Sequence, residues 1–272
     1  MVWTEITRGQ HARELPRYAS DVTDGEWAII APALPAASRR GRPRTTRLRD
    51  VVDALFYILS TGCQWRAVPR DFPPRSTVQR YFYLWRDKGV WERLNATLVG
   101  RARQAQGRAA VPSLGIIDSQ SVATTESGGP RGLDAAKRIK GRKRHIVTDT
   151  QGFLLASLVH QANLQDSHGA VPLLNSLAKA LPLRHILADR VYRGPKLLAA
   201  LADCGPWRID IVQRPHGTKG FQLLPRRWVV ERTFAWFGRN RRLAKDHERT
   251  IESANAWLVI ASVKLISRRL AK

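Results

Sequence analysis

The chain has 272 residues, of which 43% are hydrophobic, so it can bury a core in one large domain or two smaller ones. Its formal net charge of +24 favours a polyanionic partner, because a surface meant only for solubility mixes both signs. The spacing of Cys63 and Cys204 excludes a disulfide framework and a cysteine zinc site. No signal peptide is indicated, and no apolar run approaches the roughly 18 residues of a membrane span. We therefore expect a cytoplasmic protein without a membrane partner.

The first part of the chain is expected to be helical, with residues 1–20 as a loose N-terminal arm and 21–110 as a small all-helical DNA-binding domain. Thr23 to Glu26 has the form of a capping box that opens a short helix. The basic stretch that follows has an Arg-Gly-Arg-Pro core, which resembles a minor-groove-binding AT-hook. A linker that contacts phosphates is the favoured interpretation. The candidate DNA-binding residues in this stretch are Arg40, Arg42 and Arg44.

Helical spacing then predicts a buried helix from Leu48 to Ser60, a helix capped by Ser76, and a further helix after Gly89. Short loops and projecting basic side chains are typical of a helix-turn-helix-like module. Residues 106–112 are predicted to be the linker to the second part.

The second part, residues 111–272, is predicted to be an α/β domain with a mixed sheet flanked by helices. The last helix is expected to bury Trp257 while exposing Lys264, Arg268 and Arg269. The expected strands are 113–118, 144–149, 153–160, a strand that ends at 189, and 208–213, with a hairpin turn at 150–152. The expected helices are 167–181, 195–203, 225–243 and 251–270.

Three acidic residues carry the functional hypothesis in this basic half, which holds 27 Lys and Arg against 12 Asp and Glu. Asp118 and Asp189 each end an apolar run, and Glu231 lies in a largely apolar helical stretch. Burying a carboxylate is costly unless it is paired or binds a metal. Adjacent strands would bring the two aspartates within a few Å, with Glu231 above them. Such a trio suits two Mg²⁺ ions roughly 3.5–4 Å apart in phosphodiester chemistry, with Mn²⁺ as a substitute.

Basic residues near these acids are the expected DNA contacts. The run from Lys137 to Arg144 is interpreted as a clamp on the DNA backbone, with a solvated charged hairpin as the alternative. Arg227 and Arg242 share a helix face with Glu231 and would grip flanking phosphates. An i,i+4 ion pair with Arg227 is the alternative role for Glu231. The candidate DNA-binding residues of this part are Lys137, Lys140, Arg142, Lys143, Arg144, Arg227, Arg239 and Arg242.

Six motifs stand in collinear order within residues 21–270: Thr61 to Arg66, Pro69 to Thr77, Ile117 to Val122, Lys140 to His145, Ala188-Asp189 followed by Tyr192-Arg193-Gly194, and Arg226 to Arg232. With these motifs the chain resembles the DDE transposases of bacterial insertion sequences, specifically the insertion-sequence-five group. The resemblance implies an RNase H-like catalytic domain in which Asp118, Asp189 and Glu231 are the catalytic triad and the metal ligands.

The same resemblance implies recognition of terminal inverted repeats and Mg²⁺-dependent cutting and joining of double-stranded DNA. It also implies a homodimer on DNA and a place at the bacterial nucleoid. The chain departs from the pattern of its relatives around Glu231, because Leu224 and Gly238 stand where they carry Tyr and Lys. We do not transfer those two roles.

Other interpretations stay open at this point. The chain could be a DNA-binding regulator derived from a transposase without catalytic activity, or an RNase H-like nuclease that cuts without joining. Ser119 or Tyr192 as a covalent nucleophile would leave the three acids without a task. Asp149 is expected to be a turn residue, and His145 and His160 are expected to be core or surface residues rather than metal ligands.

Overall fold

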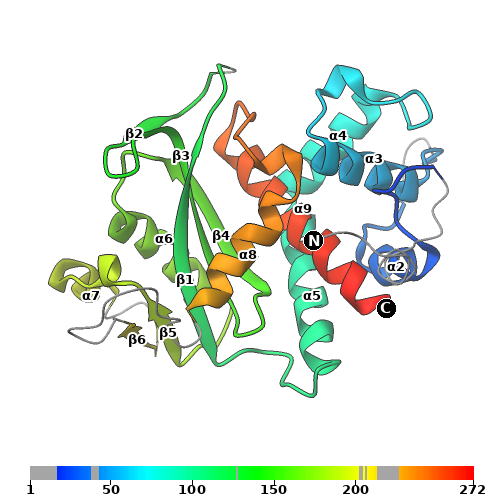
Figure 1. Cartoon of the computed structure of the whole chain (residues 1–272). Coiled ribbons are helices and arrows are strands. Elements are labelled where there is room, and N and C mark those ends of the chain that lie inside the picture. The colour runs from blue at the N-terminus through cyan, green and yellow to red at the C-terminus, as the bar shows by residue number, and fades with distance from the viewer. Residues whose placement is uncertain (1–16, 38–42, 127, 202–204, 206, 213–226) are drawn as a thin grey trace, which may run out of the picture.

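The computed structural model describes residues 17–37, 43–126, 128–201, 205, 207–212 and 227–272. A sheet lies at one end of the molecule and the N-terminal helices lie at the other (Figure 1). Two long helices, α5 (Val90–Gln104) and α9 (Ile251–Leu270), lie between them and pack against each other. Of the helices described, none is long and apolar enough to cross a membrane.

The N-terminal part is helical as predicted. Thr23 and Glu26 form the expected capping box, because each side chain bonds the backbone N–H of the other residue. The predicted cap at Ser76 is wrong, since the Pro74 carbonyl already accepts the N–H groups of Thr77 and Val78 and closes the first turn earlier. The elements before α5 are α2 (Asp24–Ile30), η1 (Ala31–Ala33), α3 (Leu48–Thr61), η2 (Trp65–Ala67) and α4 (Arg75–Asp87).

The sheet is mixed, with strand order β2-β3-β1-β5-β6 and β4 paired to β3. β1 runs antiparallel to β3 and parallel to β5, which in turn runs parallel to β6. β1 and β3 are longer than predicted because their ladder continues through polar and charged residues. The strands are β1 (Leu114–Ala123), β2 (Gly132–Asp134), β3 (Ile139–Thr148), β4 (Leu154–Gln161), β5 (His185–Ala188) and β6 (Arg208–Ile211).

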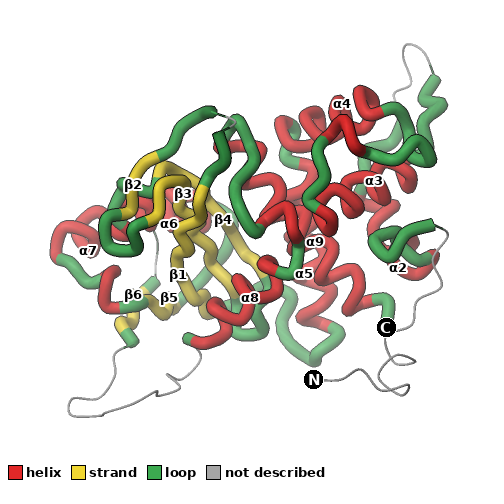
Figure 2. The backbone as a smooth tube through the Cα atoms, turned by 45° about the horizontal axis from the view of Figure 1, so that its top comes forward, coloured by secondary structure: helices red, strands yellow, loops and turns green. Residues whose placement is uncertain are grey.

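Helices cover both faces of the sheet (Figure 2). Side chains alternate along β1, so Ile116 packs into one buried cluster with α5, α8 and α9, while Ile117 packs into another with α6 and α7. Asp118, two residues beyond Ile116, therefore lies on the face that α8 covers. The helices of this part are α6 (Asp166–Ala178), η3 (Arg190–Tyr192), α7 (Pro195–Leu201), α8 (Trp228–Gly238), η4 (Arg241–Leu243) and α9.

Helix α9 has the predicted bounds, but it is buried on nearly all sides. Its Trp257 stacks on Phe82 of α4, with ring centroids 4.8 Å apart. Lys264, which was expected to be exposed, is buried, and its ammonium group donates to Ser60 Oγ and Asn240 Oδ1. Arg268 and Arg269 are half-buried. The expectation of an exposed basic face is thus wrong, because α3, α4 and η4 pack where solvent was expected.

Candidate active site and nucleic-acid interface

The topology places Asp118 and Asp189 opposite each other on neighbouring strands. In the parallel register of β1 and β5, Gly115 pairs with Ile186 and Ile116 with Leu187. Extending this register by two residues, past the end of the ladder, puts Asp118 level with Asp189. Asp118 lies within β1 rather than at its end, whereas Asp189 directly follows β5 and caps η3. The two carboxylates thus meet where β5 stops and β1 continues.

Arg227 joins Asp189 to Glu231. Its Nη2 atom lies 2.9 Å from Asp189 Oδ2 and 3.7 Å from Glu231 Oε1. Arg227 directly precedes α8 and makes no capping hydrogen bond with its side chain, and Glu231 lies one turn later on that helix. The i,i+4 ion pair foreseen as the alternative role of Glu231 is therefore present, and the same guanidinium also holds the second aspartate.

Asp118 carries a strongly perturbed carboxylate. Burial raises the pKa of Asp118 to about 6, against the lowering effect of the Ser119 backbone N–H and of the charge on Arg227. The negative charges of Glu231 and Asp189 raise this pKa further. Asp118 Oδ1 accepts the Ser119 N–H at 2.7 Å. Each of the two other acids and Arg227 thus acts on Asp118 electrostatically.

The donor chemistry of these residues fits a divalent metal, although their arrangement is not that of a formed metal site. Three carboxylates offer the hard oxygen ligands that Mg²⁺ prefers. Among the residues that the structure describes, however, no three His, Cys, Asp or Glu side chains are grouped so that they could hold a metal ion. The guanidinium of Arg227 stands between two of the candidate ligands instead.

A buried polar group lies beneath the two aspartates on the opposite face of the sheet. The Tyr192 hydroxyl lies 3.3 Å from His145 Nδ1 and shares a hydrogen bond with the side chain of Ser119. The rings of His145 and His160 stack with centroids 4.8 Å apart, and burial lowers the pKa of His145 to about 3. Tyr192 is 2% exposed, so it is not accessible as a nucleophile. Alternation along β1 predicts that Ser119 lies on this face. The residues that contact Ser119 there could be identified only from the tertiary structure.

The predicted clamp from Lys137 to Arg144 needs correction, because three of its basic residues are buried. Arg142 is fully buried and pairs with Asp246 at 3.0 Å. Lys143 pairs with Asp166 at 2.8 Å on the other face of the sheet. Arg144 donates to the Leu243 carbonyl, and burial lowers its pKa to about 10. Each of the three side chains thus bonds within the protein and is not presented to a phosphate.

Arg242 also differs from the prediction. Helix α8 ends at Gly238, so Arg242 lies in η4 and not on the face of Glu231. It is buried, donates to Glu248 Oε1 and lies over the ring of Trp257 at 5.5 Å.

The remaining candidate DNA contacts divide into exposed residues and residues that the structure does not describe. Arg44, Lys137, Lys140 and Arg239 are exposed, while Arg227 is half-buried in the acidic group. Arg40 and Arg42 lie outside the described residues. Asp149 has a structural role, since its Oδ1 accepts two N–H groups of the β3–β4 turn, as expected of a turn residue.

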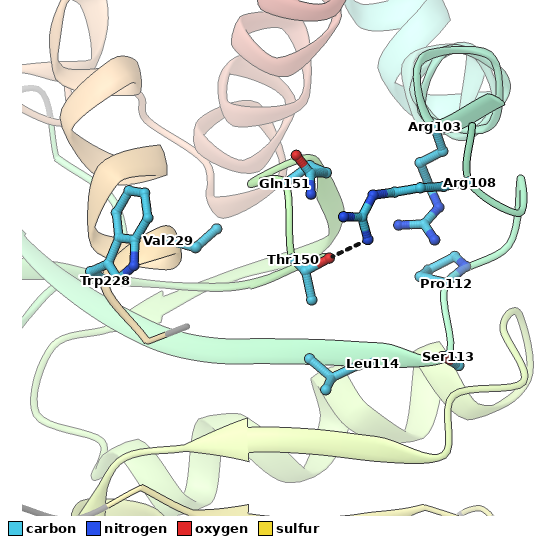
Figure 3. Close-up of a pocket in the computed structure, with 9 residues that line it drawn as sticks. All are labelled: Arg103, Arg108, Pro112, Ser113, Leu114, Thr150, Gln151, Trp228 and Val229. Carbon is cyan, nitrogen blue, oxygen red and sulfur yellow. Dashed lines mark hydrogen bonds between the residues drawn. The ribbon is translucent and has the colours of Figure 1, made fainter. Parts of the chain in front are cut away.

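A pocket of about 370 Å³ lies between the start of α8, the β3–β4 turn and the connection after α5 (Figure 3). Arg103 is tied there to Asp149, and Arg108 reaches Thr150 at 3.5 Å. Trp228 borders the pocket one turn before Glu231. None of the three candidate carboxylates is among the lining residues, so the two arginines mainly hold the connection after α5 against the turn.

The fold and the position of the acids define an RNase H-like protein. The mixed sheet has helices on both faces, and the acids come from its central strand, from the end of the parallel neighbour and from a late helix. Comparison with known families agrees. Residues 109–265 match the family described as Transposase DDE domain, and residues 22–95 match the family described as putative transposase of IS4/5 family. The chain belongs to the DDE transposases of insertion sequences, of the IS4/5 type.

Individual relatives support this membership. The chain is 34% identical over 151 residues to a putative transposase for insertion sequence element IS402 of Burkholderia cepacia, covering 53% of this chain and 69% of that protein. It is 33% identical over 109 residues to an uncharacterized 16.2 kDa protein of insertion element IS402, covering 36% and 74% respectively. The fold class and the family predicted from the sequence are thereby confirmed.

Proposed function

We propose that this transposase cuts DNA at terminal inverted repeats and joins the resulting 3′-OH ends to target DNA. The observation that carries the proposal is that Arg227 joins Asp189 to Glu231, while the charges of both acids and of Arg227 act on the buried Asp118 of β1. Acids are scarce in this half of the chain, so an acidic group at the centre of the sheet indicates a specific task.

Asp118, Asp189 and Glu231 are the residues that would hold Mg²⁺, or Mn²⁺ in its place. Asp118 supports this assignment, because it is a desolvated carboxylate with no ion-pair partner within 4 Å among the described residues. When bound, a divalent metal supplies charge stabilisation for the attacking and leaving oxygens of phosphoryl transfer.

The proposed reaction has two phosphoryl transfers. In the first, a water oxygen attacks the scissile phosphorus and the bond to the 3′ oxygen breaks, which leaves a 3′-OH and a 5′-phosphate. In the second, that 3′-OH attacks a phosphodiester of the target, so that one P–O bond forms as another breaks. No residue of the protein is bonded to DNA in either step, in agreement with the burial of Tyr192. The protein positions the strands and stabilises charge.

DNA binding is assigned to the exposed basic residues and to the N-terminal helices. Arg44 precedes α3, Lys137 precedes β3, Lys140 lies at the start of β3, and Arg239 directly follows α8. A net charge of +24 favours DNA binding, and the exposure of these side chains supports their assignment as phosphate contacts. Because joining requires two transposon ends, we propose a homodimer on DNA.

A regulator without catalytic activity is the alternative, and one observation favours it. The described residues contain no group of acids arranged to hold a metal, since Arg227 lies between Asp189 and Glu231. Such a protein would bind the terminal repeats without cutting them.

Substitution of Asp118 separates the two functions. With purified full-length protein, a duplex carrying a terminal repeat and Mg²⁺, we expect Asp118→Asn to abolish strand cleavage and to leave repeat binding within about threefold of the wild type. Cleavage is read on denaturing gels and binding by fluorescence anisotropy. Wild-type protein that binds the repeat but never cuts it, with Mg²⁺ or Mn²⁺, would establish the regulator instead.

A further inference from the structure

The positive charge of Arg227 lies beside Asp189 and Glu231, where a metal ion bound to these carboxylates would place its own charge. Its Nη2 contacts Asp189 at 2.9 Å and Glu231 at 3.7 Å, so one guanidinium neutralises two acids on different elements. The Arg227 side chain is 18% exposed, against 30% for Asp189 and 57% for Glu231, so it is more enclosed than either of the two acids that it contacts. Its charge also acts on Asp118, whose pKa it lowers.

The guanidinium is incompletely satisfied in this position. Among the described residues, the buried Nε atom of Arg227 has no hydrogen-bond partner. The two ion pairs that the side chain makes with described residues both come from the same nitrogen, Nη2, so within this part of the chain the fork that could bind an oxyanion with two parallel bonds is not used. A phosphate group near the start of α8 would satisfy this fork better than the two carboxylates do.

We propose that Arg227 is an internal counter-ion that closes the metal site in the DNA-free protein and that a DNA phosphate opens it by drawing the guanidinium away. The inference rests on the proposed function and deepens it. Once Arg227 turns to a phosphate, Asp189 and Glu231 are free to act with Asp118 as metal ligands. Metal binding and DNA binding then favour each other, because each removes the same guanidinium from the acids.

Binding of Mn²⁺ to the DNA-free full-length protein tests this inference. Free Mn²⁺ is measured by electron paramagnetic resonance during titration, so the readout does not depend on activity. We expect Arg227→Gln to bind Mn²⁺ at least about tenfold more tightly than the wild type, because the competing positive charge is gone. Lys179→Gln removes one positive charge from an exposed site at the end of α6 and serves as the matched control, with an affinity equal to that of the wild type.

Further variants locate the bound ion and guard against misfolding. In the Arg227→Gln background, Asp118→Asn should abolish the gain if the ion sits at the three acids. Arg227→Met, an uncharged side chain of similar length, should reproduce the gain, and circular dichroism verifies the fold of each variant. A mixed-sequence DNA duplex should tighten Mn²⁺ binding to the wild type more than to Arg227→Gln.

The outcomes distinguish this inference from the proposed function. Equal Mn²⁺ affinity in wild type, Arg227→Gln and Arg227→Met overturns the counter-ion role. If Asp118→Asn still weakens Mn²⁺ binding in the wild-type background, the assignment of the metal to the three acids holds even though the counter-ion role of Arg227 is overturned. If Asp118→Asn changes nothing in any background, the assignment of the metal to these acids fails as well.

Discussion

At the scale of single residues, Asp118 shows how position in a sheet sets the chemistry of a side chain. It lies in the middle of β1, on the face that α8 covers, with the Ser119 N–H as its hydrogen-bond donor. Burial and the neighbouring acids raise its pKa to about 6. The ionised form of the buried Asp118 carboxylate thus costs free energy in the folded protein, and a bound cation would offset this cost.

The raised pKa of Asp118 predicts how stability depends on pH. Between about pH 4 and pH 6 the folded protein binds a proton that the unfolded chain has released, so the contribution of this group to stability is lost as pH rises. Asp118→Asn removes the penalty. We expect the variant to match the wild type near pH 4 and to exceed its unfolding free energy by up to about 2 kcal/mol near pH 7.5. Urea unfolding at both pH values measures the difference, and an equal difference at both would contradict the assignment.

At the scale of elements, β3 shows why a run of basic residues is not always a nucleic-acid surface. Arg142 and Arg144 point to the side of η4 and the start of α9, and Lys143 points to the start of α6. Each finds a partner there, and Arg142 pairs with Asp246, which is equally buried. The basic run therefore ties the sheet to the elements on both faces.

A pair of substitutions on β3 separates the structural role from DNA binding. Arg142→Met leaves the buried Asp246 carboxylate without its partner, and we expect a loss of about 3–5 kcal/mol of unfolding free energy. Lys140→Met, at an exposed position two residues earlier, should leave stability within about 0.5 kcal/mol and weaken DNA binding. Urea unfolding and fluorescence anisotropy give the two readouts. A stable Arg142→Met variant with impaired DNA binding would instead support the interpretation of the basic run as a clamp on DNA.

A second pair of substitutions tests the arginines that follow Glu231. Arg239 is exposed at the end of α8, whereas Arg242 is buried against Glu248 and Trp257. We expect Arg239→Gln to reduce the salt dependence of DNA binding by about one unit of slope and to leave stability unchanged. Arg242→Gln should instead lower stability without changing the slope. DNA affinity measured at several salt concentrations provides the slope. A changed slope for Arg242→Gln together with a loss of stability for Arg239→Gln would contradict these two assignments.

At the scale of the whole molecule, one buried cluster crosses the predicted domain boundary at residue 110. It contains Phe56 and Phe82 of the N-terminal helices together with Trp257 of α9 and Ile116 of β1. Helix α9 is the last element in the chain, yet it packs against α5 near the middle of the chain and against the sheet. The division into 21–110 and 111–272 remains a prediction, and it does not correspond to separate cores.

This shared core predicts that the protein unfolds as one unit. Trp257 is 1% exposed and contacts aromatic rings of both α4 and η2. We expect Trp257→Ala to lower the unfolding free energy by about 3–5 kcal/mol while keeping a single transition. Far-ultraviolet circular dichroism and tryptophan fluorescence should report the same midpoint. Two separated transitions would show that the helical part and the sheet are independent domains.

The sequence by itself determined the kind of sheet, through helical and strand periodicity and through capping residues. Collinear motifs indicated the family. Carboxylates that follow apolar runs in a basic chain led to the choice of the three acids as the site, which stays a prediction. The capping box at Thr23, the bounds of α9 and the turn at Asp149 were predictable for the same reason.

Only the tertiary structure decided which charges are available to a ligand. Arg142, Lys143, Arg144 and Arg242 look like exposed cations along the chain, but distant segments supply their acidic and carbonyl partners. Arg227 was expected on the face of Glu231, yet its contact with Asp189 depends on how α8 packs across the sheet, since Asp189 follows another element, β5. Burial and ion pairing depend on neighbours far apart in sequence, and such neighbours are chosen by packing rather than by local pattern.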